Sequence, residues 1–349
     1  MGNQGQGGPA FLQEGVVLQG APIVVRPVDL VHIALNPNRE RDGASNSIAV
    51  AYAGLNGAPG APRSAEGPEG LVEIDGGFYR EYESGRIYTK RQVGTFWVFG
   101  AIGARYTELG GPSSSLGWPT SPEVDFDGGR VTTFQNGAIY WWPDTGAIDL
   151  GDVALRYKGL ACFGETDWDQ GSDSDEPYAV LGVIPADVTR SQALASQVHE
   201  DVDAIESRGD LIDLYVGRPH GAVVRTTIME QDFGTPEQAR EVAAAGVEVG
   251  TDVVSGALEL IPYVGPILGT AAERAIKGAE TDISDAVVRM FGLRDDTIGT
   301  DTLVLSPKQM VTMTRTPQQE FMGIGYRVET ALLNRHGASY KAYLDVEPV

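Results

Sequence analysis

The segment GGFYREYESGRIY, residues 76–88, recurs 52 residues later as GGRVTTFQNGAIY, residues 128–140. Both copies place two glycines before an aromatic residue (Tyr82 or Phe134), then a further glycine and an Ile-Tyr pair. Apolar residues that alternate around glycine-containing turns predict short antiparallel β-hairpins. Since so short a hairpin cannot bury a core alone, we expect the two copies to pack together as one module.

The segment between the copies, IGARYTELGGPSSSLGWPTSPEVDFDGG (residues 102–129), adds an ordered set of Gly, Pro and aromatic positions. Together with the second copy it resembles the LGFP repeat of actinobacterial cell-envelope proteins, with Trp118 at the name-giving aromatic position. The resemblance covers about 76–151 and implies attachment to envelope polysaccharide or peptidoglycan. We therefore expect an LGFP-like repeat module at 71–151.

Aromatic residues are the candidate glycan-binding groups of this module, because a flat apolar ring with a polar edge can stack on a sugar. The alternative is that these rings form the core of a small glycine-rich module. The candidates are Trp97, Trp118, Tyr140, Trp141 and Trp142.

Length, charge and cysteine content restrict the class of protein. The chain has 349 residues, enough for two or three domains, and 42% of them are hydrophobic. A net charge of −22 argues against a nucleic-acid partner. The single cysteine, Cys162, excludes an intramolecular disulfide and a cysteine-based zinc site, and its apolar surroundings favour a core role over a nucleophilic one.

The N-terminal segment, residues 1–70, is rich in Gly, Pro and Ala. Apolar runs at 15–35 and 47–55 predict short strands separated by loops. The first residues lack the basic start and apolar stretch of a secretory signal. Because the envelope resemblance implies an extracellular or cell-surface location, the export route stays open.

An acidic loop, ETDWDQGSDSDEPYAV (165–180), lies between two predicted strands at 152–163 and 177–184. It fits an EF-hand poorly, because Gly171 and Tyr178 fall at ligand positions. The order of Asp169, Gly171, Asp175 and Pro177-Tyr178 is similar to the first acidic loop of the calcium-dependent lipid-binding β-sandwich of the protein kinase C and synaptotagmin type. That resemblance implies a β-sandwich over 152–349.

A second acidic segment would complete the site that this resemblance implies. A strand ending near Glu230 and Asp232 and a later strand after Asp296 are separated by about sixty residues. Calcium accepts six to eight oxygen ligands of irregular geometry, so two loops can share one ion. A solvated acidic rim is the alternative. The expected calcium ligands are Asp167, Asp169, Asp175, Glu230, Asp232 and Asp296.

The intervening residues, about 235–292, predict a helical hairpin. Thr235, Pro236 and Gln238 form a helix-start signal, and Pro262, Gly265 and Pro266 break the pattern at LIPYVGPIL. Acidic and basic residues interrupt both helices, so neither is expected to span a bilayer. The apolar turn can pack on its own domain or contact a membrane or partner through Leu260, Ile261, Tyr263, Val264 and Ile267.

Residues 319–333 and 337–348 predict closing strands, and 190–206 a short helix. The four histidines are scattered, and neither a nucleophile elbow nor a phosphate loop is present. The expected fold is mainly β: a Gly-rich β-hairpin repeat module, then an antiparallel β-sandwich with an inserted α-helical hairpin.

The expected function is non-enzymatic attachment to bacterial envelope glycan, with calcium binding in the sandwich. A membrane-active toxin component and a structural subunit of a larger assembly are the alternatives, and a homo-oligomer is compatible with the latter.

Overall fold

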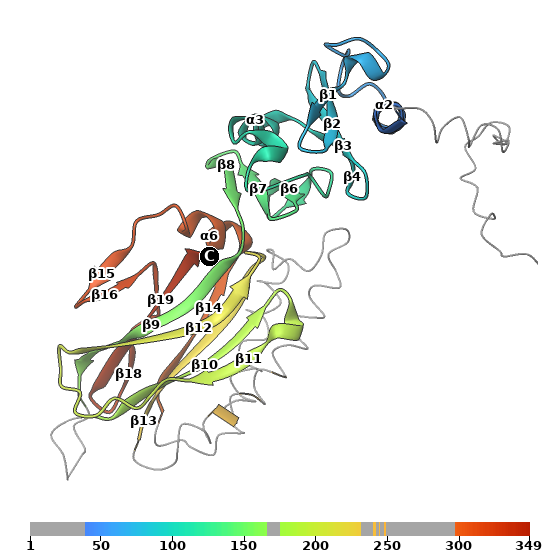
Figure 1. Cartoon of the computed structure of the whole chain (residues 1–349). Coiled ribbons are helices and arrows are strands. Elements are labelled where there is room, and N and C mark those ends of the chain that lie inside the picture. Colours follow the sequence, from blue (N-terminus) through green and yellow to red (C-terminus); the bar gives the residue numbers. More distant parts are fainter. Residues whose placement is uncertain (1–38, 166–174, 232–239, 242–243, 245–247, 249–296) are drawn as a thin grey trace, which may run out of the picture.

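The computed structural model describes residues 39–165, 175–231, 240, 241, 244, 248 and 297–349. These residues form an N-terminal array of two helix-and-sheet units, joined to a larger pair of antiparallel sheets (Figure 1). The described architecture is mainly β and antiparallel, with glycine-rich hairpins in the repeat region, as predicted.

Each unit of the repeat array, residues 39–150, consists of one helix followed by a four-stranded antiparallel sheet. The first unit comprises α2 (Arg39–Gly54), β1 (Val72–Ile74), β2 (Gly77–Tyr82), β3 (Gly85–Lys90) and β4 (Gly94–Val98). The second comprises α3 (Gly100–Glu108), β5 (Val124–Phe126), β6 (Gly129–Phe134), β7 (Gly137–Trp142) and β8 (Gly146–Leu150). Every strand of the second sheet therefore begins 52 residues after its counterpart in the first.

The same contacts recur around one tyrosine in each helix. The Tyr52 hydroxyl donates to the carbonyl of Gly60 (3.0 Å), and the Tyr106 hydroxyl donates to that of Gly117 (2.7 Å). Tyr52 stacks on Tyr82 of β2, with ring centroids 4.8 Å apart. Tyr106 packs on Phe134 of β6 at 4.4 Å. Each helix is thus held to its own sheet by one ring contact and one hydrogen bond to the connecting loop.

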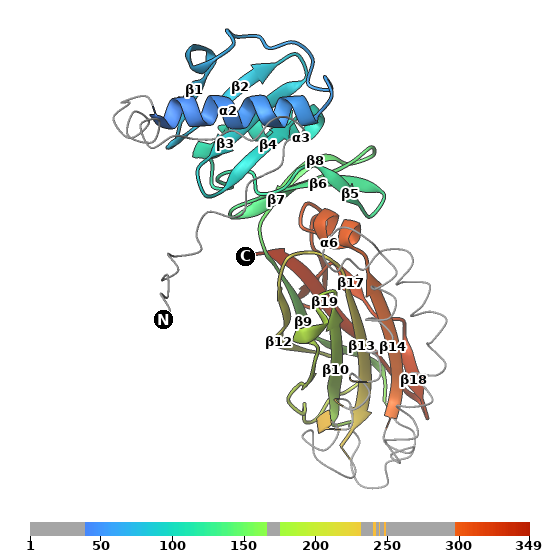
Figure 2. The ribbon, with the colours of Figure 1, turned by 90° about the vertical axis from the view of Figure 1, so that its right-hand side faces the viewer.

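Side chains on neighbouring positions of one strand serve different hydrophobic clusters, because successive residues of a strand point to opposite faces. Ile87 of β3 packs with Ile48 of α2, whereas Tyr88 packs with Ile102 and Tyr106 of α3. In the second sheet, Ile139 belongs to the α3 cluster and Tyr140 to the core of the following sandwich. Helices and sheets therefore alternate as layers along the array, as Figure 2 shows.

The sandwich, the described residues from 153 to 349, contains two sheets whose strand orders are β11-β10-β13-β14 and β12-β9-β19-β17, with β18 paired to β19. The bounds in the first sheet are β10 (Pro177–Pro185), β11 (Gln192–Ala195), β13 (Ala222–Glu230) and β14 (Thr297–Leu305). In the second they are β9 (Val153–Gly164), β12 (Ser207–Gly217), β17 (Val328–Glu329), β18 (Leu333–Arg335) and β19 (Ala338–Pro348). A hairpin of β15 (Gln319–Phe321) and β16 (Ile324–Tyr326) and the helix α6 (Pro307–Met313) complete it.

The core of the sandwich continues into the second repeat sheet. One cluster of buried side chains joins Leu155 of β9, Leu181 of β10 and Leu344 of β19 to Tyr140 and Trp142 of β7. Met310 and Val311 of α6, both fully buried, belong to the same cluster. The repeat array and the sandwich thus share one hydrophobic core.

Helix α6 takes the place beside the second sheet that the helix of a further repeat would occupy (Figure 2). A capping box of Ser306 and Gln309 begins it. The Lys308 backbone N–H then donates to the Asp127 carboxylate in the β5–β6 turn (2.9 Å), and its ammonium pairs with Asp144 in the β7–β8 turn (2.7 Å). A carboxylate at a free helix N-terminus is favourable, so both hairpin turns of the second sheet hold this helix.

The structure corrects three expectations and confirms others. Residues 47–55 lie largely in helix α2 instead of a strand, so the boundary expected at residue 70 falls inside the first unit. Residues 190–206 contain the strand β11 in place of a helix. The segment 319–333 breaks into short strands, while the strands expected at 152–163, 177–184 and 337–348 are confirmed.

The equivalent tyrosines allow a matched test of the repeat contacts. We expect Tyr106→Phe to lower the free energy of unfolding by about 1–2 kcal/mol, because it leaves the carbonyl of Gly117 without its donor in a fully buried site. Tyr52→Phe should cost less, because its hydrogen bond is only partly buried. Urea denaturation of the full chain measures both. Equal losses would contradict this description of the two units.

The junction also predicts a pH dependence. The ring of His220, in the β12–β13 loop, contacts Phe126 of the second sheet (centroids 5.7 Å apart). Burial and, to a smaller extent, the charge of Arg218 lower the pKa of His220 from 6.5 to about 4, against the opposing effect of Asp152. The folded state holds this imidazole neutral. The contribution of His220 to the free energy of unfolding is therefore fully present above pH 6.5, and it is lost as the pH drops toward 4.

Thermal or urea unfolding between pH 7 and pH 4 checks this expectation. The wild type should lose up to about 3 kcal/mol more than a His220→Gln variant over that range, since the glutamine does not titrate. Parallel pH profiles for the two proteins would show that His220 has no such role.

Candidate functional site

Three of the five candidate glycan-binding rings are buried. Trp118 and Trp142 are each 1% exposed and Tyr140 is 0% exposed. Trp142 also donates its indole N–H to the carbonyl of Asp127 (2.9 Å). A ring with neighbours on both faces cannot stack on a sugar, so the prediction is wrong for these three residues, which form part of the core as the alternative expects.

Trp118 has a structural role between the two units. Its indole lies against Gly77, where the Cβ of any larger residue would come within 2.5 Å of the ring. It also meets the ring of Tyr88 edge-on, with centroids 6.3 Å apart. Trp118, at the name-giving aromatic position of the repeat, therefore connects the loop of the second unit to the sheet of the first. The absence of a side chain at Gly77 provides the space for its ring.

Trp97 is partly exposed, packs in part against the cluster that contains Ile48, and is held in a fixed orientation. It lies on β4, stacks on Phe99 with centroids 3.8 Å apart and an interplanar angle of 17°, and donates its indole N–H to the carbonyl of Ser84 (2.7 Å). Phe99, which is also partly exposed, directly precedes α3. We call Trp97 and Phe99 the aromatic pair. A preorganised flat surface of this kind suits the apolar face of a pyranose ring.

Trp141 is the other candidate ring that keeps solvent exposure. It lies on β7 opposite Ala147 of β8, and part of the ring packs against the cluster around α3. The position equivalent to Trp97 in the second unit is Asp149, which pairs with Arg105 at 2.9 Å and with Arg315 at 3.3 Å. An ion-pair cluster thus replaces the aromatic pair in the second unit.

The described part of the expected calcium site lies at one end of the sandwich. Pro177 pairs with Glu230, and Met229 pairs with Thr297. The register therefore brings the start of β10, the end of β13 and the start of β14 to the same edge. The chain enters and leaves both acidic segments here.

Both described candidate ligands have protein partners. Asp175 is 1% exposed, and its Oδ2 accepts a hydrogen bond from the Tyr340 hydroxyl (2.7 Å). Burial raises the pKa of Tyr340, and its contacts with Cys162 and Asp175 raise it further, so the hydroxyl keeps its proton as donor. Oε1 of Glu230 accepts from the backbone N–H of Glu176 (2.6 Å). Within the described ranges, no group of three or more His, Cys, Asp or Glu side chains is arranged to hold a metal.

The other expected ligands, Asp167, Asp169, Asp232 and Asp296, lie outside the described residues. So do the expected contact residues of the hairpin turn, Leu260, Ile261, Tyr263, Val264 and Ile267. Arg240, Glu241, Ala244 and Glu248 are described in this part of the chain, and all four are helical and exposed. Among the described residues, no helix is long and apolar enough to cross a membrane.

Sequence reasoning missed the helix of the first unit, although a signal was present. Ile48, Tyr52, Leu55 and Gly57 have the same spacing as Ile102, Tyr106, Leu109 and Gly111. In the structure, Pro62 pairs with Tyr82 as Pro119 pairs with Phe134. The backbone N–H of Ala61 donates to Glu83 as that of Trp118 donates to Gln135. The structural repeat thus includes the helix, and the loop from Gly57 to the start of β1 is longer than the equivalent loop from Gly111 to the start of β5.

Comparison with known families also finds two copies, with different limits, because the first match begins after α2 and includes α3. Residues 60–114 and 116–161 each match the LGFP repeat model. The chain therefore contains an LGFP-repeat module, a type of repeat associated with the cell envelope. No curated protein matches the chain. The resemblance of 152–349 to the calcium-dependent lipid-binding sandwich stays a prediction.

Proposed function

We propose that this chain is a non-enzymatic adhesin that attaches to envelope polysaccharide or peptidoglycan of a bacterial surface through its LGFP-repeat module. It acts outside the cell or at the cell surface. Two matched repeats support the envelope role. The aromatic pair is the observation that carries the glycan role, because it combines solvent exposure with a ring orientation fixed by a hydrogen bond.

The aromatic pair has two features that favour stacking on a sugar, partial exposure and a fixed ring orientation. Stacking on a pyranose requires an accessible aromatic face that does not have to be ordered on binding. The indole N–H of Trp97 is already bonded to Ser84, and Phe99 supports one face of the indole. Little side-chain entropy is then lost when a glycan binds.

Sedimentation with an insoluble actinobacterial cell-wall fraction tests this function. We expect Trp97→Ala to weaken binding of the full chain about threefold to tenfold, the loss of one ring contact. Trp97→Phe should retain most of the affinity because it keeps a ring. Phe96→Ala is the matched control, since Phe96 is the adjacent, partly exposed residue on the opposite face of β4.

Circular dichroism should show that all three variants are folded. Wall binding that is unchanged by Trp97→Ala would remove the aromatic pair as the site. Wall binding that persists after residues 39–151 are deleted would remove the module from this role.

Calcium binding at the acidic end of the sandwich is a second candidate, favoured by the register that brings both acidic segments to one edge. Carboxylates from two loops could then share one ion, which would offset their mutual repulsion. If the sandwich binds calcium, the hairpin would contact a partner or a membrane beside the ion. The alternative of a membrane-active toxin component rests on the same hairpin.

Isothermal titration of the full chain with CaCl2 tests it. We expect a saturable binding heat for the wild type. The affinity for calcium should be lower in Asp169→Asn and in Asp232→Asn, since each variant loses a charged ligand. Asp213→Asn is the control, because Asp213 lies on β12 and pairs with Arg156 at 2.6 Å. A titration without binding heat, or one that responds equally to all three variants, would contradict the site.

A further inference from the structure

An exposed apolar patch lies where two loops of the sandwich meet the end of β9. Phe163 is 39% exposed, Ile205 73% and Met322 41%. Phe321 stacks on Phe163 with centroids 5.4 Å apart. We call these four residues the tip patch.

Hydrogen bonds show that the members of the tip patch are neighbours, although they are far apart in sequence. The backbone N–H of Ile205 donates to the carbonyl of Cys162 (3.0 Å), next to Phe163. The Ser207 hydroxyl donates to the carbonyl of Met322 (2.8 Å). Beneath them, Phe321 stacks on Tyr343, which packs on Tyr326 (5.8 and 4.6 Å between centroids). The patch therefore has a rigid aromatic base.

Two members of the tip patch have a backbone conformation that disfavours their side chains. Ile205 has φ of 68° and Met322 has φ of 50°. Left-handed backbone is costly for a β-branched residue and is normally taken by Gly, Asn or Asp. Met322 and Gly323 form the two-residue turn between β15 and β16, where Asn-Gly is the preferred pair.

The rest of the described chain follows the ordinary preference. Eight described residues other than glycine have positive φ, and six of them are polar: Asn56, Asp75, Gln92, Asp127, Asp201 and His336. The two apolar exceptions, Ile205 and Met322, lie in the same patch. Strain retained at an exposed apolar side chain is not explained by folding, and it points to a binding role.

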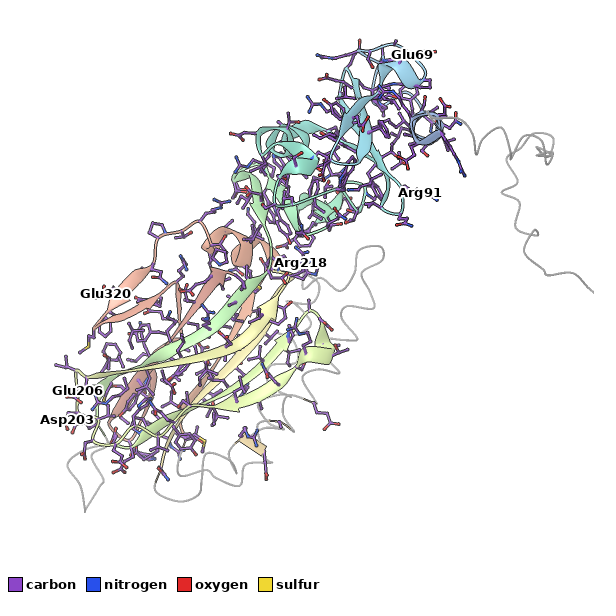
Figure 3. The ribbon with its side chains drawn as sticks, in the orientation of Figure 1. Glu69, Arg91, Asp203, Glu206, Arg218 and Glu320 are labelled. Atoms are coloured by element: carbon purple, nitrogen blue, oxygen red, sulfur yellow. The ribbon has the colours of Figure 1, made fainter. Side chains whose placement is uncertain are left out.

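The surroundings of the tip patch are acidic. Asp203 and Glu320 are exposed, and they lie along the same side of the sandwich in Figure 3. The cations on neighbouring strands are already paired: Arg208 with Glu206 at 2.7 Å, and Lys341 with Glu329 at 2.6 Å. An apolar centre with an acidic rim is complementary to a cationic partner with apolar side chains.

The same charges disfavour other occupants. A second copy of the chain would bring another acidic rim against the first, and each copy carries a net charge of −22, so the two would repel. An anionic lipid surface would be repelled likewise. We propose that the tip patch docks a protein segment in which lysine or arginine residues flank apolar side chains.

Binding of designed peptides to the full chain tests this proposal. The probe is a fluorescently labelled 14-residue peptide of alternating lysine and leucine, compared with a lysine/serine peptide of equal charge. We expect the lysine/leucine peptide to bind more tightly, and its affinity to fall with rising salt. Equal binding of the two peptides would mean that charge alone attracts them and would overturn the proposal.

Asparagine variants separate binding from folding. Ile205→Asn and Met322→Asn should each weaken binding of the lysine/leucine peptide at least about fivefold. They should leave the melting temperature unchanged or raise it, since asparagine tolerates left-handed backbone. Val50→Asn is the matched control, because Val50 is 65% exposed on α2, outside the patch, and it should bind like the wild type.

Three outcomes would overturn the docking surface. The first is unchanged peptide binding in both asparagine variants. The second is a large fall in melting temperature, which would show that the two side chains support the fold. The third is that the wild type binds phosphatidylserine vesicles and the asparagine variants do not, while peptide binding is the same in all of them. That result would assign the patch to a membrane.

Discussion

The two repeat sheets carry apolar side chains on both faces, and each face has to be covered. Ile87 and Tyr88 are adjacent on one strand, yet both are buried, the first under α2 and the second under α3. Their counterparts Ile139 and Tyr140 repeat the arrangement. Since a sheet with two apolar faces is unstable at the end of an array, a terminal cap is required. Here α6 and the β12–β13 loop of the sandwich provide it.

This constraint decides which aromatic residues are available for binding. Covering both faces buries Trp118, Tyr140 and Trp142 and leaves exposure mainly at strand ends and loops, where Trp97 and Phe99 lie. It also fixes the sandwich to the array, because Lys308 is tied to both hairpin turns of the second sheet. The aromatic pair and the tip patch thus belong to one continuous folded unit, with the first in the repeat array and the second in the sandwich.

The sequence predicted the parts of the fold that local patterns determine. The hairpins around Gly76–Gly77 and Gly128–Gly129 and the long strands β9, β10 and β19 follow from alternation and turn glycines. Helix α2 was missed because SIAVAYAGL alternates over a few residues like a strand, whereas its Ile48, Tyr52 and Leu55 have helical spacing. Which rings would be buried could not be predicted, since it depends on the layers that cover each face. The positive φ of Ile205 could not be predicted either, because no local sequence pattern indicates it.

Hydrogen exchange of the full chain measures most directly whether the array and the sandwich share one core. Met310→Ala in α6 removes a fully buried side chain from the cluster that contains Tyr140 and Trp142. If α6 is the cap, protection should fall in β6 and β7 of the second sheet and stay unchanged in β2 and β3 of the first. A loss of protection confined to the sandwich would contradict the account.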